Sequence, residues 1–144
     1  MRVLGIDYGE RRLGLAASDE TGSIAFPAGT LERRGTRRDL EALRAVVAER
    51  SIERLVVGLP LHLSGREGEA ARAARAFAAQ LGEALGLPVE TIDERFTTLE
   101  AERALREQGA FGRRGRRLRR QAVDATAATL LLRTWLARHA GERG

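Results

Sequence analysis

The sequence predicts an α/β fold in which helices pack on a mixed five-stranded sheet, and three observations support this. Short apolar runs recur along the chain, as strands buried in a sheet require. The first three runs follow one another closely, which is typical of an antiparallel meander. After them, stretches with helical spacing of apolar residues alternate with further short runs, which is typical of strands joined by helices.

Five segments fit the strand pattern. Pro27 is expected to bend the third of them, because proline removes a backbone donor from the sheet. Gly58 and Pro60 end the fourth. In chain order the predicted strands are Val3–Ile6, Leu13–Ala17, Ile24–Leu31, Leu55–Val57 and Val89–Ile92.

Four segments fit the helix pattern. The first begins with Thr36 as its cap and has apolar residues at Leu40, Leu43, Val46 and Val47. The second covers 68–85, with one face formed by Ala70, Ala74, Phe77, Leu81 and Leu85. Thr97 and Glu100 form a capping-box pattern for a third helix that ends at Gly109. The fourth is predicted over 121–138.

The chain has 144 residues, which predicts one domain over 1–138 and a frayed tail over 139–144. It has no cysteine, so disulfides and thiolate metal sites are excluded. No apolar run approaches the roughly 20 residues that span a bilayer. We therefore expect a cytoplasmic protein that does not associate with a membrane.

The basic charge is concentrated in one segment. All 25 basic residues are arginines, and six of them occur within 113–120, a segment without acids. The remaining 19 stand against 20 acidic residues, so the rest of the chain is close to neutral. Guanidinium groups bind phosphate oxygens in pairs, which favours nucleic-acid contact at Arg113, Arg114, Arg116, Arg117, Arg119 and Arg120. A solvated loop in a chain with a general preference for arginine is the alternative.

Three acids interrupt apolar patterns. Asp7 follows the first strand, and Gly9 beside it allows a ligand or another backbone to approach closely. Glu94 follows the fifth strand, although Asp93 points to the opposite face and the sequence does not decide which face holds a site. Asp124 has helical spacing with Ala127, Ala128, Leu131 and Trp135, which places it on the face that packs on the sheet.

If these acids converge, their mutual repulsion calls for a cation. Mg²⁺ or Mn²⁺ prefers such oxygen ligands, and a pair of these ions is a common device for hydrolysing phosphodiesters. We therefore expect Asp7, Glu94 and Asp124 to be both metal ligands and catalytic residues of a nuclease. Separate structural roles are the alternative: Asp7 as a turn cap, Glu94 paired with Arg95, and Asp124 as an acid favoured at a helix N-terminus.

Four motifs resemble those of the RuvX (YqgF) family of ribonuclease H-like proteins. They span nearly the whole chain, in the family's order. The first is Gly5-Ile6-Asp7-Tyr8-Gly9, followed by Arg12, Gly14, Ala16, Ser18 and Asp19. The second is Val57-Gly58-Leu59-Pro60-Leu61 with Gly65 and Gly68, the third Asp93-Glu94-Arg95-Phe96-Thr97-Thr98, and the last Val123-Asp124-Ala125-Thr126-Ala127-Ala128.

The resemblance implies the same three acids as metal ligands and a role in maturing the 5′ end of precursor 16S rRNA. Arg12 and Arg95 within these motifs are expected to contact nucleic acid, and Gly9, His62 and Gly65 to line a substrate loop. Two departures are notable. Arginines replace the lysines that the family commonly has before its last motif, and arginine cannot donate a proton near neutral pH. His62 stands where a small amide residue is expected.

Three other functions compete with an RNA nuclease. A resolvase of branched DNA shares the fold, but it needs two active sites and hence a stable dimer. No clear dimer face is visible in the sequence, which favours a monomer or a weak homodimer. A sugar kinase or actin-like ATPase shares the Asp-x-Gly pattern, but such proteins close two domains around a nucleotide. An RNA-binding assembly factor without catalysis is the alternative from another class.

Overall fold

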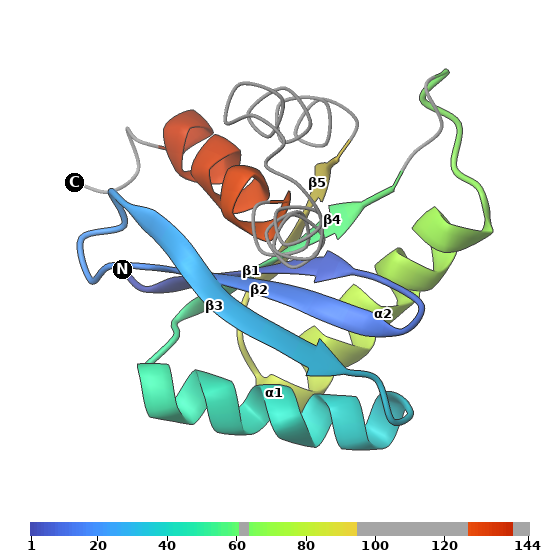
Figure 1. Ribbon diagram of the computed structural model, residues 1–144, viewed down its shortest axis with the longest axis horizontal. Helices are drawn as coiled ribbons and strands as arrows, with labels where there is room; N and C mark the ends of the chain where they lie inside the picture. The colour runs from blue at the N-terminus through green and yellow to red at the C-terminus, as the bar shows by residue number, and fades with distance from the viewer. Residues whose placement is uncertain (61–63, 95–126, 140–144) are drawn as a thin grey trace, which may run out of the picture.

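The centre of the protein is a mixed five-stranded sheet, as the sequence predicts. The computed structural model describes residues 1–60, 64–94 and 127–139. Its strands are β1 (Val3–Tyr8), β2 (Arg12–Ser18), β3 (Ala25–Glu32), β4 (Arg54–Leu59) and β5 (Val89–Asp93), in the spatial order β3-β2-β1-β4-β5 (Figure 1). β1 and β3 both pair antiparallel with β2, whereas β4 runs parallel to β1 and β5 parallel to β4.

Helices cover both faces of this sheet. α1 (Thr36–Arg50) and α2 (Glu69–Leu85) lie on one face, and the helix over 127–138 lies on the other (Figure 1). The apolar side chains form two buried groups because strand residues alternate between the two faces. The group under α1 and α2 includes Leu4, Ile6, Leu55, Val57 and Phe77. The group under the last helix includes Val3, Val56, Ile92, Leu131 and Trp135.

Two details of the helices differ from the sequence prediction. Thr36 does not cap α1: Gly35 occupies the N-cap position with φ of 112°, no side chain caps the helix, and Thr36 is the first helical residue. The buried face of α2 contains Ala71 rather than Ala70, which is exposed. In an alanine-rich helix the apolar spacing fits more than one face, and packing against the sheet selects one of them.

The predicted bend at Pro27 coincides with an irregularity in the sheet. Pro27 pairs with Ala16, and the β2–β3 register shifts between Gly14 and Ala16. β3 is an edge strand, where proline is tolerated because the position of its missing N–H can face away from the sheet.

Several predicted segments lie outside the described residues. These are the helix over 97–109, the first part of the last helix and the tail beyond His139. His139 itself is held in place, because its ring stacks on Trp135 with centroids 4.1 Å apart. Within the described part of the chain, every helix is too short or too polar to cross a bilayer.

Candidate acid site and its arginine turn

Asp7 lies on the sheet face covered by the last helix. It is the penultimate residue of β1, one position inside the strand rather than after it as the sequence suggested. Its neighbour across the β1–β2 pair is Gly14, and directly paired residues share a face. The Asp7 side chain therefore projects next to a position that has no side chain.

Glu94 reaches the same place from β5. It follows the strand directly, and its backbone N–H donates to the carbonyl of Leu59 at 3.1 Å. Ile92, two residues earlier, packs under the last helix, so alternation directs Glu94 to that face as well. The side chains of Glu94 and Asp7 interact directly. Of the two neighbouring acids, Glu94 is therefore the one that meets Asp7.

The surroundings of Glu94 favour its protonated form. The Glu94 residue is only 9% exposed. Burial raises the pKa of Glu94 to about 10, and the hydrogen bond to Asp7 and the charges of Asp7 and Asp93 act in the same direction. At neutral pH and without a cation, this pKa keeps Glu94 a neutral acid beside Asp7.

Glycines on the neighbouring strands make room for this pair. A Cβ on Gly58 of β4 would overlap both the Glu94 carboxyl group and the Cδ1 atom of Leu131. A Cβ on Gly5 of β1 would lie 3.0 Å from the Cβ of Leu132, so Gly5 lets the last helix approach the sheet closely. Gly14 lies opposite Asp7 in the β1–β2 pair. Gly14 and Gly58 thus place backbone, without side chains, beside the two acids.

The donor set fits a hard divalent cation. Asp7 and Glu94 interact closely enough to raise the pKa of Glu94, and a cation that replaces its proton would remove the repulsion between two ionised carboxylates. The described residues contain no group of three potential metal ligands. Asp124, the third predicted ligand, lies outside them.

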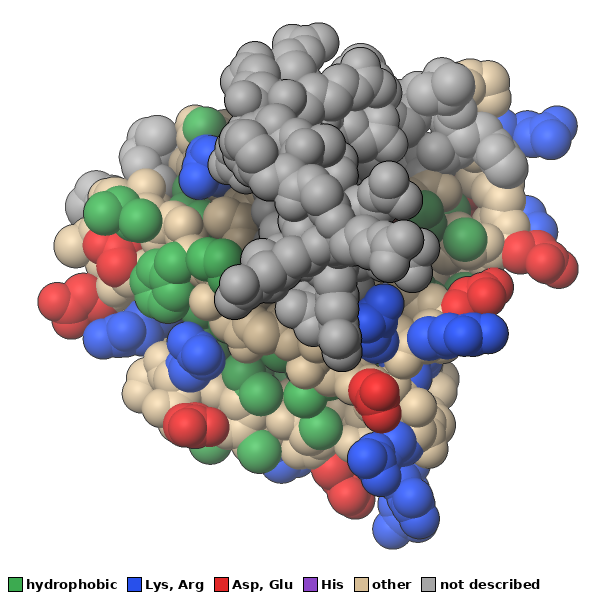
Figure 2. Space-filling view, in the orientation of Figure 1, with side chains coloured by type: hydrophobic (Ala, Val, Ile, Leu, Met, Phe, Trp, Pro, Cys, Tyr) green, Lys and Arg blue, Asp and Glu red, His purple; other side chains and the backbone are tan. Residues whose placement is uncertain are grey.

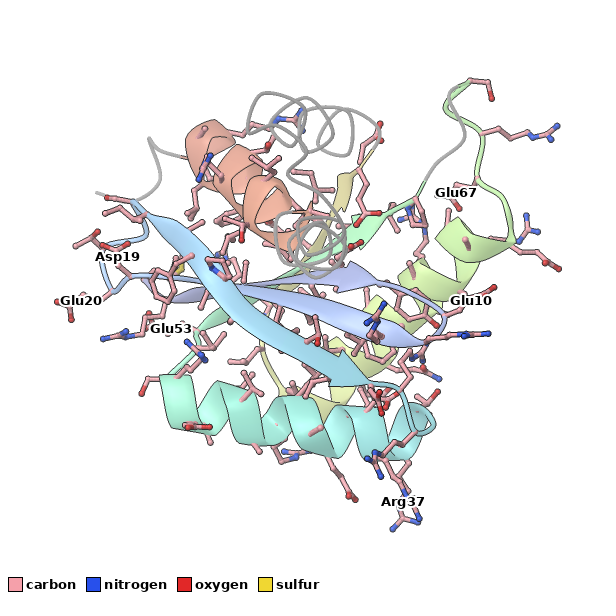
Figure 3. The ribbon with its side chains drawn as sticks, in the orientation of Figure 1. Glu10, Asp19, Glu20, Arg37, Glu53 and Glu67 are labelled. Atoms are coloured by element: carbon pink, nitrogen blue, oxygen red, sulfur yellow. The ribbon has the colours of Figure 1, made fainter. Side chains whose placement is uncertain are left out.

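The turn between β1 and β2 adjoins the acid site. A hollow of about 350 Å³ is lined by Asp7, Gly9, Glu10, Arg11, Arg12 and Gly14. Arg11 and Arg12 are exposed, and Glu10 lies at the tip of the turn (Figure 3). Position 9 requires glycine, because a Cβ atom there would lie 2.5 Å from the Arg12 carbonyl oxygen. The turn thus places cationic side chains within the same hollow as the Asp7 carboxylate.

A family model described as "RuvX: Holliday junction resolvase" matches residues 1–138. The chain belongs to the RuvX family. A relative from Anaeromyxobacter dehalogenans (strain 2CP-C), named "Putative pre-16S rRNA nuclease", is 46% identical over 140 residues, which cover 97% of this chain and 99% of the relative. A relative of the same name from Koribacter versatilis (strain Ellin345) is 45% identical over 143 residues, covering 99% of this chain and 90% of the relative.

Solved structures of DNA resolvases share the RuvX chain's fold. Thermus thermophilus RuvC in complex with a Holliday junction has a TM-score of 0.57 and 20% identity, with 96% of each chain covered. Fowlpox virus resolvase with its Holliday junction substrate has a TM-score of 0.56 and 9% identity, covering 96% of this chain and 98% of that one. At these identities the likeness shows the fold alone, and it confirms the ribonuclease H-like α/β architecture.

The structure locates some of the remaining family-motif residues. Gly65 lies between β4 and α2 with φ of 88°, a conformation that favours glycine. The other predicted site residues lie outside the described residues: His62, Arg95, Asp124, Arg113, Arg114, Arg116, Arg117, Arg119 and Arg120.

Sequence reasoning assigned no role to several residues that shape this RuvX site. The sequence predicts that Gly58 ends the fourth strand, but it lies inside β4, where an isolated glycine signals close approach of another group. Gly14 gives the same signal. Arg11 lies next to the predicted contact Arg12. The ion pair of Arg33 with Asp39 gives no periodic signal, because it joins the segment after β3 to the first turn of α1.

Proposed function

We propose that this chain is a metal-dependent nuclease that hydrolyses phosphodiester bonds of precursor 16S rRNA during maturation of its 5′ end. One observation carries the proposal. A buried acid, Glu94, interacts with the half-buried Asp7 beside an arginine-bearing turn in a chain of the RuvX family. Carboxylates that hold cations and arginines that hold phosphates are the two components that phosphodiester hydrolysis needs.

Each side chain has a distinct task. Asp7 and Glu94 supply carboxylate oxygens to the cations, and Asp124 is the proposed third ligand. Glu94 gives up its proton when the site is loaded, so loading is favoured by rising pH. Bound Mg²⁺ or Mn²⁺, as a pair of ions, supplies activation of water and neutralisation of the phosphate charge. Arg11 and Arg12 hold the phosphate backbone beside the acids.

The curated relatives support the RNA substrate. They are named for pre-16S rRNA and match along nearly their whole length. The arginines of the segment 113–120 then contact the RNA backbone, and recognition rests on shape more than on base sequence. We place the enzyme in the cytoplasm, acting as a monomer or a weak homodimer.

Resolution of a DNA junction is the second candidate. The description of the matching family and the folds of the two junction-bound resolvases favour it. It requires two acid sites on one branched substrate, and hence a stable dimer. Sedimentation of the protein with a four-way junction therefore separates the two candidates independently of cleavage.

The test is cleavage of a labelled precursor 16S RNA and a four-way DNA junction, side by side. Wild type, Asp7→Asn, Glu94→Gln and Asp124→Asn are compared in Mg²⁺, Mn²⁺ and chelator. Glu83→Gln removes an exposed carboxylate of α2 and is the control. We expect metal-dependent cleavage of the RNA that the control keeps and the three site variants lose. RNA binding without cleavage by any metal form would overturn the proposal in favour of an assembly factor.

A further inference from the structure

Arg33 joins three parts of the molecule through one guanidinium group. Its Cζ atom lies 4.5 Å from the ring centroid of Tyr8 and 5.5 Å from that of Phe77. Its Nε donates to the Asp39 carboxylate at 3.1 Å, and its Nη1 donates to the Gly9 carbonyl at 3.3 Å. The side chain of Arg33 is only 15% exposed. Arg33 is therefore a packed residue of the fold rather than a surface cation.

Asp39 is the ion-pair partner of Arg33. Its side chain is 3% exposed, and its second oxygen accepts a hydrogen bond from the backbone N–H of Arg34 at 2.9 Å. Burial disfavours the charged form of Arg33, but hydrogen bonds and charge interactions with Tyr8 and Asp39 outweigh it and raise the pKa of Arg33. A buried ion pair contributes little net stability compared with apolar residues, but it fixes geometry through its directed hydrogen bonds.

The geometry that this pair fixes is that of the β1–β2 turn. The side chain of Arg33 binds the carbonyl of Gly9, and its backbone N–H binds the carbonyl of Arg11 at 2.9 Å. Both ends of the turn segment 9–11 are thus attached to one residue. The same turn lines the hollow beside Asp7 and presents Arg11 and Arg12.

We propose that Arg33 and Asp39 are positioning residues that hold the β1–β2 turn in the conformation in which Arg11 and Arg12 contact the nucleic-acid backbone. This rests on the proposed function, since it assigns the turn to the substrate. Neither Arg33 nor Asp39 touches the substrate. Preorganisation of this kind raises affinity because the turn does not have to be ordered on binding.

Two substitutions with opposite changes in charge distinguish a positioning role of Arg33 and Asp39 from simple attraction of nucleic acid by charge. Arg33→Met removes one positive charge, whereas Asp39→Asn removes one negative charge. If Arg33 attracted nucleic acid only through its charge, Asp39→Asn would tighten binding. If the pair positions the turn, both substitutions weaken binding, by about tenfold each if one phosphate contact is lost. Arg33→Lys keeps the charge but not the fork that spans Asp39 and Gly9, so it should restore binding only in part.

The measurement is the Kd of a precursor 16S RNA fragment in chelator, with kcat and KM in Mg²⁺. Arg54→Met is the matched control: its side chain is 25% exposed, pairs with Glu90 and lies at the start of β4, away from Leu59 and the acid site. It also loses one positive charge. We expect KM and Kd to rise for Arg33→Met and Asp39→Asn with a smaller change in kcat, and the control to bind like wild type.

A double-mutant cycle completes the test. In an Arg11→Ala, Arg12→Ala background, Asp39→Asn should weaken binding no further, because the contacts it acts through are gone. Tighter or unchanged binding by Asp39→Asn in the wild-type background, or full additivity in the cycle, would overturn the inference. If Arg33→Met fails to fold, Asp39→Asn and Arg33→Lys carry the same comparison. Failure of wild type to bind or cleave RNA would instead refute the proposed function.

Discussion

The Glu94→Gln variant tests the protonation state of the acid pair without a cation. Glutamine has the shape of a protonated glutamic acid, and its NH₂ group can donate a hydrogen bond as a protonated carboxyl group can. It cannot ionise. Replacing Glu94 by glutamine therefore mimics the neutral form of this side chain and removes the ionised one.

The expected gain in stability follows from the pKa. The ordinary pKa of a glutamate is 4.5, and in the folded protein that of Glu94 is raised to about 10. The folded state binds this proton more tightly than the unfolded state, so the free energy of unfolding falls as the pH rises from about 4.5 to about 10. The loss is about 1.4 kcal/mol per pH unit. At about pH 7.5 it reaches an upper limit of about 4 kcal/mol, which Glu94→Gln avoids.

Urea unfolding in chelator at several pH values measures this difference. Glu94→Gln should match wild type near pH 4.5 and exceed it increasingly above that. Millimolar Mg²⁺ should narrow the gap, because only the wild-type site binds the ion with both acids. Glu83→Gln controls for the loss of one carboxylate. Equal stability of Glu94→Gln and wild type across the whole pH range would refute the argument, since it would mean that Glu94 is ionised in the metal-free fold.

Three further outcomes are expected. Gly58→Ala places a methyl group against the Glu94 carboxyl group. It should lower the free energy of unfolding by about 1–3 kcal/mol and the cleavage rate by more than about 100-fold. A folded Gly58→Ala protein that cleaves RNA at close to the wild-type rate would contradict this. Trp135→Phe loses the 2.6 Å hydrogen bond from Nε1 to Glu90 and should cost about 1–3 kcal/mol in urea unfolding, with cleavage per folded molecule unchanged. Hydrogen bonds from a threonine hydroxyl and two backbone amides of its own turn lower the pKa of Asp19. The ionised Asp19 therefore stabilises the fold at neutral pH, and this stabilisation is lost as the pH falls below about 3.8. Asp19→Asn should unfold at a lower temperature than wild type at pH 7 but not at low pH.

The strands and helices could be predicted because each is marked by local composition. The apolar runs at Val3–Ile6 and Leu55–Val57 are buried on both faces, and no other element fits such short runs between turns. The predictions failed where local patterns were ambiguous. Thr36 is a good capping residue, but Gly35 occupies the N-cap position of α1. The Asp39 carboxylate accepts a hydrogen bond from the backbone N–H of Arg34, which precedes the helix.

The acid site could be predicted only in part. Asp7 and Glu94 are visible as acids after apolar runs, but their meeting depends on the parallel pairing of β1, β4 and β5. The choice of Glu94 over Asp93 required the register of that pairing. Arg33 could not have been found, because its partners come from the β1–β2 turn, α1 and α2 and are brought together only by packing.

The order of strands in the sheet has a consequence for how the chain folds. Asp7 belongs to the meander β1–β2–β3, whose pairings are local in sequence, whereas Glu94 arrives only after β4 and β5 have been added across two helices. Local pairings form faster than distant ones. We therefore expect the penalty for bringing the two acids together to arise late in folding. A penalty that arises after the main barrier speeds unfolding more than it slows folding. A cation held by both acids would then lengthen the lifetime of the native state and change the rate of its formation little.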